Sequence, residues 1–181
     1  MLRNKVKNDT KEIHKYVEKL PIMKAILSNS ISSSNYLNYL IQLSYIYKSI
    51  ESNKLYEKLE WNIKLYNNSI KDIKILSKDN EVIVPYSITT IYCNYLSCID
   101  NIDILAGHAY VRYMADLMGG RILKKKIEKN FPTNVYDIEN ITDTKDKIID
   151  YINKCVSDYK LFETSVQHSF SLYAAILQIY I

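Results

Sequence analysis

Apolar residues recur along most of the chain at intervals of three and four positions, the spacing that places them on one face of an α-helix. Polar or proline-containing stretches separate these periodic segments. The pattern predicts helices over residues 8–20, 22–27, 35–59, 61–76, from 85 onward, 104–130, 144–158 and 159–180. We also expect a serine-rich turn that caps a helix at 28–34, a polar linker at 77–80 and an acidic surface loop at 137–143. No internal repeat divides the chain, so we expect one domain over residues 1–181.

Glycine and proline are scarce, with three of each among 181 residues. A β-rich protein with many turns would need more of both. Because 48% of the residues are hydrophobic, a chain of this length can bury one substantial core. The expected fold class is therefore all-α.

The formal net charge of +4 is dispersed over an ordinary polar surface and does not suggest nucleic acid as a partner. The cysteines, Cys93, Cys98 and Cys155, lack the spacing of a disulfide framework or a zinc site. They indicate a reducing compartment, so we expect a cytoplasmic protein, with a plastid-type organelle as the alternative. The charged N-terminus has no apolar core of a signal peptide, and the apolar C-terminal run from Phe170 is shorter than the roughly 20 residues that span a bilayer.

All three glycines lie between Gly107 and Gly120, and Gly119-Gly120 falls inside a predicted helix. Each glycine in a helix interior costs about 1 kcal/mol relative to alanine. A pair also favours a kink. The usual compensation is the close approach of another backbone or of a flat ligand, to which a residue without Cβ presents no obstacle.

Two titratable groups stand out because of their helical spacing. His14 lies four positions before Glu18, which places the carboxylate beside the imidazole. Asp116 lies four positions before Gly120. Taken alone, each has a structural explanation: a half-exposed histidine, a solvated or salt-bridged aspartate, and glycines that serve tight helix packing. His108 and His168 are interpreted as packing or surface residues.

Taken together, two blocks of sequence resemble the biliverdin-producing heme oxygenase family. The first is Thr10–His14 followed by Glu18, and the second runs from His108 to Lys125 as HAYVRYMADLMGGRILKK. Weaker similarity extends over almost the whole chain. The resemblance implies an all-α multi-helix bundle in which heme lies between a proximal N-terminal helix and a kinked, glycine-containing distal helix.

The resemblance also implies roles for individual residues. His14 matches the proximal ligand of the heme iron, and Glu18 matches the carboxylate that orients its imidazole. Gly119 and Gly120 match the glycines that let the distal helix lie over the heme face. Asp116 matches the distal aspartate, which orders water on the oxygen-binding side.

The resemblance implies further roles around the distal aspartate and the heme propionates. Tyr47 and Arg112 match partners of the distal aspartate, and Lys7, Tyr110 and Lys147 match groups near the heme propionates. The implied reaction uses heme as cofactor and substrate, with O2 and external electrons, and yields biliverdin, carbon monoxide and Fe2+. The implied partner of a monomeric enzyme is an electron donor such as ferredoxin, flavodoxin or a reductase, for which the basic run 124–129 offers complementary charge.

Some positions depart from the family pattern. Ala115 replaces a usual glycine, Met118 a small residue, Tyr151 a propionate-binding arginine and Tyr173 an asparagine. These departures leave open a second function, a heme-binding or interaction module without turnover. A di-iron oxidase would need inward-facing carboxylates and Glu-x-x-His pairs that the sequence lacks.

Overall fold

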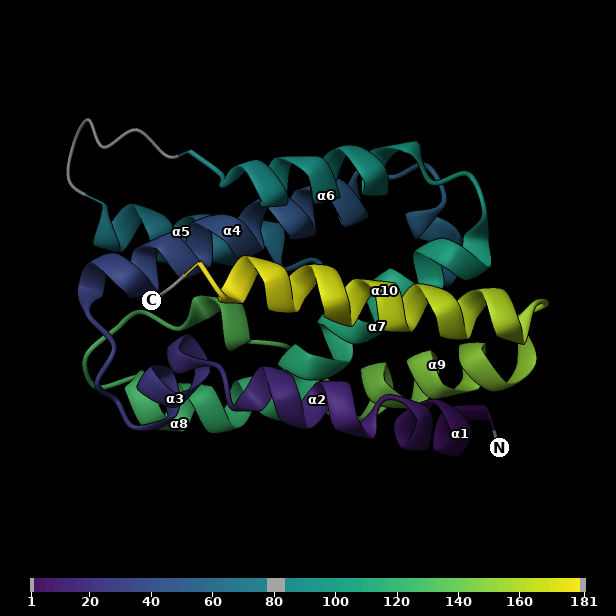
Figure 1. Cartoon of the computed structure of the whole chain (residues 1–181), viewed down its shortest axis with the longest axis horizontal. Coiled ribbons are helices and arrows are strands. Elements are labelled where there is room, and N and C mark those ends of the chain that lie inside the picture. The colour runs from purple at the N-terminus through teal and green to yellow at the C-terminus, as the bar shows by residue number, and fades with distance from the viewer. Residues whose placement is uncertain (1, 78–83, 180–181) are drawn as a thin grey trace.

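The computed structural model describes residues 2–77 and 84–179, and these residues form helices and turns but no strand. The predicted all-α class is therefore confirmed. The elements in chain order are α1 (Leu2–Asp9), α2 (Lys11–Glu18), α3 (Pro21–Leu27), α4 (Ser33–Glu51), the 3-10 turn η1 (Tyr56–Leu59), α5 (Tyr66–Leu76), α6 (Ser87–Cys98), α7 (Ile102–Ala115), the π turn η2 (Asp116–Gly120), α8 (Arg121–Ile127), the 3-10 turn η3 (Asn134–Tyr136), α9 (Ile141–Lys154) and α10 (Tyr159–Leu177) (Figure 1).

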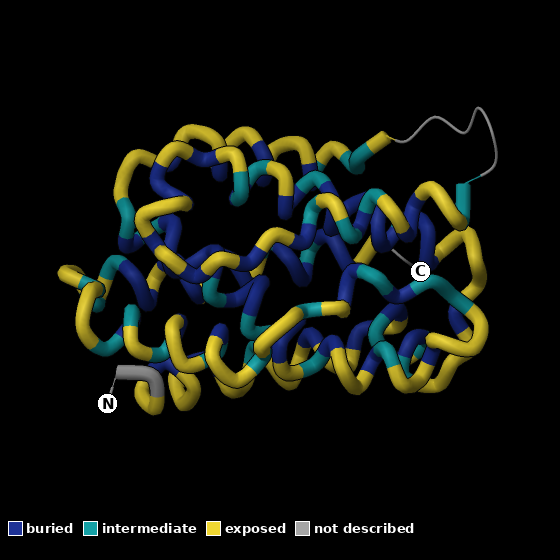
Figure 2. Tube along the Cα trace, turned by 180° about the vertical axis from the view of Figure 1, so that it is seen from behind, coloured by how far each residue is buried: buried dark blue, intermediate teal, exposed yellow. Residues whose placement is uncertain are grey.

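Helix α10 lies at the centre of the bundle and packs along α7, with further contacts to α2 and α6. On one side of it, α4 packs against α5 and α6. On the other side, α1 packs against α9 and α3 against α8. Figure 2 shows that buried residues face inward from both sides and that exposed residues cover the outer surface. None of the described helices is both long and apolar enough to cross a lipid bilayer.

The close contact of α7 and α10 depends on Gly107. A Cβ added to this glycine would lie 2.7 Å from the Cβ of Ser165 and 2.8 Å from the carbonyl oxygen of Phe162. Both distances are too short for real atoms, so only glycine permits this approach of two helices. Gly107 thus serves tight helix packing, the structural explanation that the sequence offered for Gly119-Gly120.

The predicted helix over 35–59 is wrong over residues 52–59, because α4 ends at Glu51 and η1 follows. The Glu51 carboxylate accepts hydrogen bonds from the backbone N–H groups of Leu65 (2.7 Å) and Tyr66 (3.1 Å). The side chain of Asn53 donates to the carbonyl oxygens at the end of α6. These long-range bonds satisfy backbone groups at the start of α5 and at the end of α6, and they turn the chain where periodicity alone predicts a continuous helix.

The predicted helix over 61–76 begins five residues late, at Tyr66. Before it, Trp61, Ile63 and Leu65 are buried while the residues between them are exposed. Asn62 has a φ of 56°, in the left-handed region, so the backbone turns here and the regular helix begins only after it.

The remaining helix boundaries agree more closely with those predicted from the sequence. Pro21 separates α2 from α3, and Ser32 caps α4 by accepting from the N–H of Asn35 at 3.2 Å. A helix that the pattern does not predict, α1, precedes α2, and α6 begins at Ser87, two residues after the expected proline. The segment expected at 104–130 is confirmed as α7, η2 and α8 in succession, and α9 occupies 141–154 rather than 144–158. Helix α10 begins at 159 as expected; the linker expected at 77–80 and the helix end expected at 180 lie largely outside the described residues.

Candidate functional site

A buried ion pair joins the end of α7 to the π turn. The Arg112 guanidinium donates from Nε to Oδ2 of Asp116 at 3.2 Å and from Nη2 to Oδ1 at 3.1 Å. The Tyr47 hydroxyl, from α4, donates to the same Oδ2 at 2.7 Å. The exposed fractions are 2% for Asp116, 5% for Arg112 and 0% for Tyr47. The structure thus brings together all three residues for which the sequence predicts a distal role.

The electrostatics of this cluster favour its hydrogen-bonded form. Burial, and then the Asp116 carboxylate, raise the pKa of Tyr47 well above its usual value, so its hydroxyl stays protonated as a donor. Burial alone would lower the pKa of Arg112, but Asp116 and the neighbouring tyrosines 173, 47 and 39 together outweigh this effect and raise it. The Arg112 guanidinium therefore stays charged, and the Asp116 carboxylate beside it compensates this charge in the protein interior.

Helix α10 contributes Tyr173 to the same cluster. The Arg112 guanidinium lies 4.3 Å from the centroid of the Tyr173 ring, within the range of a cation–π contact. The hydroxyl groups of Tyr173 and Tyr39 are 3.2 Å apart. Nη1 of Arg112 is buried and has no hydrogen-bond partner within the described part of the chain. A buried donor of this kind commonly bonds to ordered water or a ligand.

The two glycines of the π turn have different surroundings. A Cβ at Gly119 would meet no atom of the described residues within 4 Å, apart from its own helix. A Cβ at Gly120 would lie 2.7 Å from Cδ1 of Tyr136. Near Gly119, the apolar side chains Met118 and Ile122 are 52% and 56% exposed. One glycine therefore faces open space beside exposed apolar groups, and the other faces the protein interior.

The proximal candidate His14 lies on α2, with its side chain 54% exposed. Its Nδ1 is 3.4 Å from Oε1 of Glu18, which is 58% exposed. The predicted pairing of the two residues on one helix face is confirmed. The ring centroid of His14 is 5.9 Å from that of Phe170 on α10, in an edge-on arrangement.

Helix α10 connects the proximal and distal candidates. His14 contacts Phe170, and Arg112 contacts Tyr173, one turn further along the same helix. Both groups of candidate residues therefore approach the same short stretch of α10.

The three residues expected near the propionates are less closely grouped. Lys147 on α9 pairs with Asp143 at 2.8 Å, and both are exposed. Lys7 is exposed on α1, which packs against α9. Tyr110 is half-buried on α7, with its ring centroid 5.9 Å from that of Phe162.

His108 is buried in α7, and His168 is exposed on α10, as expected for packing and surface residues. Nδ1 of His108 is 2.8 Å from the Tyr92 hydroxyl, which is 3.0 Å from Oγ of Ser169. Burial, with a smaller effect of His168, lowers the pKa of His108 to about 3. Its imidazole is therefore neutral at physiological pH.

Two further aspartates, Asp72 and Asp103, are buried outside the distal cluster, and the sequence patterns do not predict a role for them. Asp103 accepts from the N–H groups of Ser157 and Asp158 and from the Ser157 hydroxyl, and so attaches α7 to the start of α10. Asp72 binds the segment around η3 in the same way. The sequence did offer one signal for the burial of Asp72: it lies directly beside Ile73, on the apolar face of its helix.

The fold and the site together define an all-helical protein with a buried polar cluster behind a glycine-containing π turn and an exposed His–Glu pair on a neighbouring helix. The family model for heme oxygenase matches residues 1–155. The chain belongs to the heme oxygenase family, which confirms the family and the enzyme class predicted from the sequence.

Individual relatives agree with this assignment. A heme oxygenase of Porphyra purpurea is 29% identical over 162 residues, which cover 80% of this chain and 69% of the relative. One from Guillardia theta is 28% identical, with coverage of 76% and 66%. The chain thus spans about two thirds of the length of these relatives.

Solved structures agree on the fold. The heme oxygenase of Leptospira interrogans has a TM-score of 0.86 at 21% identity and covers 98% of both chains. Heme oxygenase-1 of Synechocystis, solved in complex with heme, has a TM-score of 0.84 at 18% identity, with coverage of 98% of this chain and 91% of that one.

Proposed function

We propose that this chain, folded as one domain, binds heme between α2 and the π turn η2 and oxidatively cleaves it to biliverdin, carbon monoxide and Fe2+. The observation that carries the proposal is the preassembled cluster of Tyr47, Arg112 and Asp116 directly beside the open face of Gly119. A polar cluster that is buried and hydrogen-bonded beside an apolar, glycine-bearing face suits a flat apolar macrocycle with a polar reaction centre.

The distal face fits a porphyrin by two further features of the structure. Gly119 presents no side chain, and its exposed apolar neighbours Met118 and Ile122 offer surface that gains from being covered. Nη1 of Arg112 is a buried donor without a partner within the described residues, as expected beside a site that holds water or a ligand. Met118 therefore lies at the edge of the site rather than in the protein core.

On the proximal side, we assign His14 as the axial ligand of the heme iron. A glutamate at Nδ1 favours the tautomer with its proton on that nitrogen and leaves the lone pair of Nε2 for the metal. Neutral imidazole is a common proximal ligand of heme. Glu18 acts through His14, as a residue that orients the ring.

Bound heme supplies an iron that binds dioxygen and a macrocycle that is itself oxidised. The role of Asp116 follows from its lone pairs. Its carboxylate already accepts three hydrogen bonds, from Tyr47 and Arg112. Because a carboxylate has about four acceptor sites, about one remains for a water molecule. Asp116 thus holds a water at a defined place on the distal side and transfers a proton through it.

The heme propionates need cations or hydroxyl groups at the edge of the site. We assign this role to Lys7, Lys147 and Tyr110, on α1, α9 and α7. Tyr151, where the family has an arginine, is half-buried against Trp61, with ring centroids 5.7 Å apart. Since Tyr151 offers no positive charge, Lys7 and Lys147 carry the electrostatic part of propionate binding.

The electrons must come from a partner protein or reductase. The exposed lysines 125, 126 and 129 follow the distal turn directly and favour an acidic donor of the ferredoxin or flavodoxin type. We expect the enzyme to act as a monomer in a reducing compartment, cytoplasmic or plastid-type. The three cysteines, none of which forms a disulfide, support such a compartment.

A titration with hemin tests the proposal. The purified protein should form a complex with a sharp Soret band, and ascorbate or reduced ferredoxin in air should replace this band with the broad red absorption of biliverdin. Binding without bleaching would contradict the catalytic proposal. His14→Ala should change the Soret band, whereas His168→Ala, a matched exposed histidine on α10, should not. Asp116→Ala should retain hemin but form no biliverdin.

A further inference from the structure

The segment of residues 134–137, here called the rear segment, contacts the distal turn from inside the protein. Its Tyr136 is 3% exposed, and its ring fills the place where a side chain of residue 120 would be. The 2.7 Å between a Cβ at Gly120 and Cδ1 of Tyr136 is shorter than any real contact. Gly120 is therefore required by the protein interior, whereas Gly119 faces the opposite, open side.

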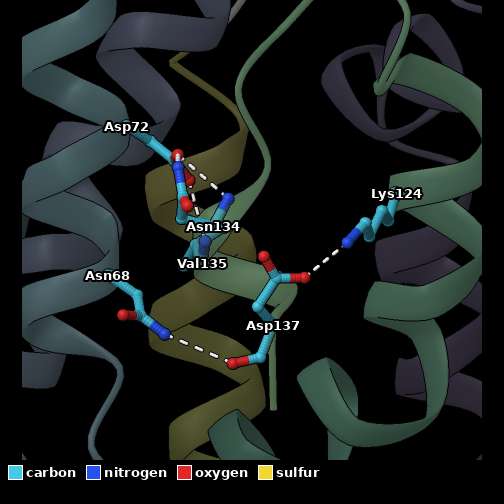
Figure 3. A network of polar contacts seen from close by, with 6 residues as sticks. All are labelled: Asn68, Asp72, Lys124, Asn134, Val135 and Asp137. Carbon is cyan, nitrogen blue, oxygen red and sulfur yellow. Dashed lines mark hydrogen bonds and ion pairs between the residues drawn. The ribbon is translucent and has the colours of Figure 1, made fainter.

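Asp72 holds the rear segment in place. This carboxylate is 0% exposed on α5. Its Oδ1 accepts from the backbone N–H of Asn134 at 2.9 Å and from the Asn134 side chain at 2.6 Å, and its Oδ2 accepts from the N–H of Val135 at 2.8 Å (Figure 3). A buried carboxylate that accepts hydrogen bonds from successive backbone N–H groups has a fixed orientation, and it fixes the orientation of that chain segment as well.

The rear segment is also attached to the distal helix itself. Asp137 forms an ion pair with Lys124 of α8, and its carbonyl oxygen accepts from the Asn68 side chain of α5 at 3.3 Å (Figure 3). Gly120 and Lys124 are four positions apart and share one helix face. The consecutive residues Tyr136 and Asp137 thus contact this face at two points, one turn apart.

We infer that Asp72 and Tyr136 are positioning residues for the distal turn: they set, from the rear, the depth at which residues 116–120 present Gly119 and Asp116 to the ligand. Asp72 does not touch the ligand side and acts only through the rear segment. The packing part of this inference concerns the protein alone. Its consequence for bound heme rests on the proposed function.

The surroundings of Tyr136 connect it with the distal cluster. Burial, and then the neighbouring tyrosines and Asp116, raise the pKa of Tyr136 well above its usual value. The phenol ring thus lies within electrostatic reach of the Asp116 carboxylate. A shift of the rear segment would therefore move the neighbours of Asp116 together with the backbone of its turn.

Thermal unfolding of the protein without heme tests the packing. Gly120→Ala should lower the midpoint, whereas in a Tyr136→Leu background the same substitution should leave it unchanged or raise it, because alanine is the better helix former. Gly119→Ala is the control and should be neutral or stabilising, since nothing within the described residues opposes its Cβ. If Gly120→Ala lowered the unfolding midpoint equally in both backgrounds, the proposed contact between residue 120 and Tyr136 would be wrong.

Hydrogen exchange tests the positioning role without heme. In Asp72→Asn, the side-chain NH2 group replaces one of the two accepting oxygens and faces a donor N–H group. Two donors cannot bond to each other, so at least one of the three hydrogen bonds to the rear segment is lost. We expect exchange of the amides of residues 116–120 to become faster on the order of tenfold. The control is Asp150→Asn, which removes an exposed carboxylate paired with Lys154 at 2.8 Å. Equal protection of these amides in both variants would show that Asp72 does not position the turn.

A spectroscopic measurement extends the test to bound heme. In the carbon monoxide complex, Asp72→Asn should shift or broaden the C–O stretching band while hemin still binds, because the distal polar groups have moved. If Asp72→Asn lowered the unfolding temperature but left the C–O stretching band unchanged, Asp72 would stabilise the fold without positioning the distal groups. If the native protein bound no hemin, the proposed function would fail, and the unfolding and exchange experiments would still decide the inference.

Discussion

The distal and proximal sides of the candidate site differ in how the protein holds them. On the distal side, Tyr47, Arg112 and Asp116 are at most 5% exposed and make three hydrogen bonds of 2.7–3.2 Å. On the proximal side, His14 and Glu18 are 54% and 58% exposed, and a single contact of 3.4 Å joins them.

This difference shows which part of the site forms with the protein core. The distal cluster joins residues of α4, α7, η2 and α10, so it can exist only when the bundle is packed. The proximal pair belongs to one short helix and gains little from folding. Substitutions on the distal side should therefore reduce stability, whereas those on the proximal side should reduce heme binding alone.

The largest loss of stability is expected for Asp116→Ala, which leaves the Arg112 charge buried without a partner. Removal of one member of a buried pair costs about 3–5 kcal/mol. Urea unfolding of the protein without heme measures this loss. The double variant Arg112→Met/Asp116→Leu should lose clearly less, and a cost of Asp116→Ala near zero would show that water reaches the pair.

A smaller loss is expected for Tyr47→Phe, which keeps the ring in place and removes only the hydroxyl that donates to Asp116. A hydrogen bond to a charged group contributes about 1.5–3 kcal/mol. Urea unfolding again measures the difference. The control is Tyr173→Phe, whose hydroxyl bonds to the neutral Tyr39 and should contribute less.

The buried His108 should make stability depend on pH. Its pKa of about 3 in the folded protein lies below its value in the unfolded chain, which therefore binds more protons between these limits. Stability is thus lost as the pH falls below about 6.5, by up to about 1.4 kcal/mol per pH unit. His108→Gln should reduce this slope. The control His168→Gln, at an exposed position, should leave it unchanged, and equal slopes for native protein and His108→Gln would contradict the prediction.

The smallest effect on stability is expected for His14→Ala. Because the side chain is half exposed, the free energy of unfolding without heme should change by less than about 0.5 kcal/mol. Hemin affinity should nevertheless fall at least about tenfold, and Glu18→Gln should weaken it less, since a residue behind a metal ligand acts indirectly. Unfolding and hemin titration of the same variants separate the two effects, and unchanged affinity would sink the proximal assignment.

The sequence by itself determined the all-α class, most of the helices and the segment that carries the glycines. Helical periodicity is a local property, and scarcity of glycine and proline restricts the chain as a whole. The motif from His108 to Lys125 was sufficient for the family, and the resemblance identified Arg112 as a partner of Asp116. The contact of His14 with Glu18 followed from their spacing of four positions on one helix.

Only the tertiary structure decided how these segments end and which groups face each other. Helix α4 stops at Glu51 because that carboxylate binds backbone groups fourteen and fifteen residues later. Tyr47 reaches Asp116 across 69 positions of sequence. Gly119 and Gly120, equivalent in the sequence, face open space and the Tyr136 ring, respectively. Long-range hydrogen bonds and packing select among conformations that local spacing leaves equally favourable, so they become visible only when the chain is folded.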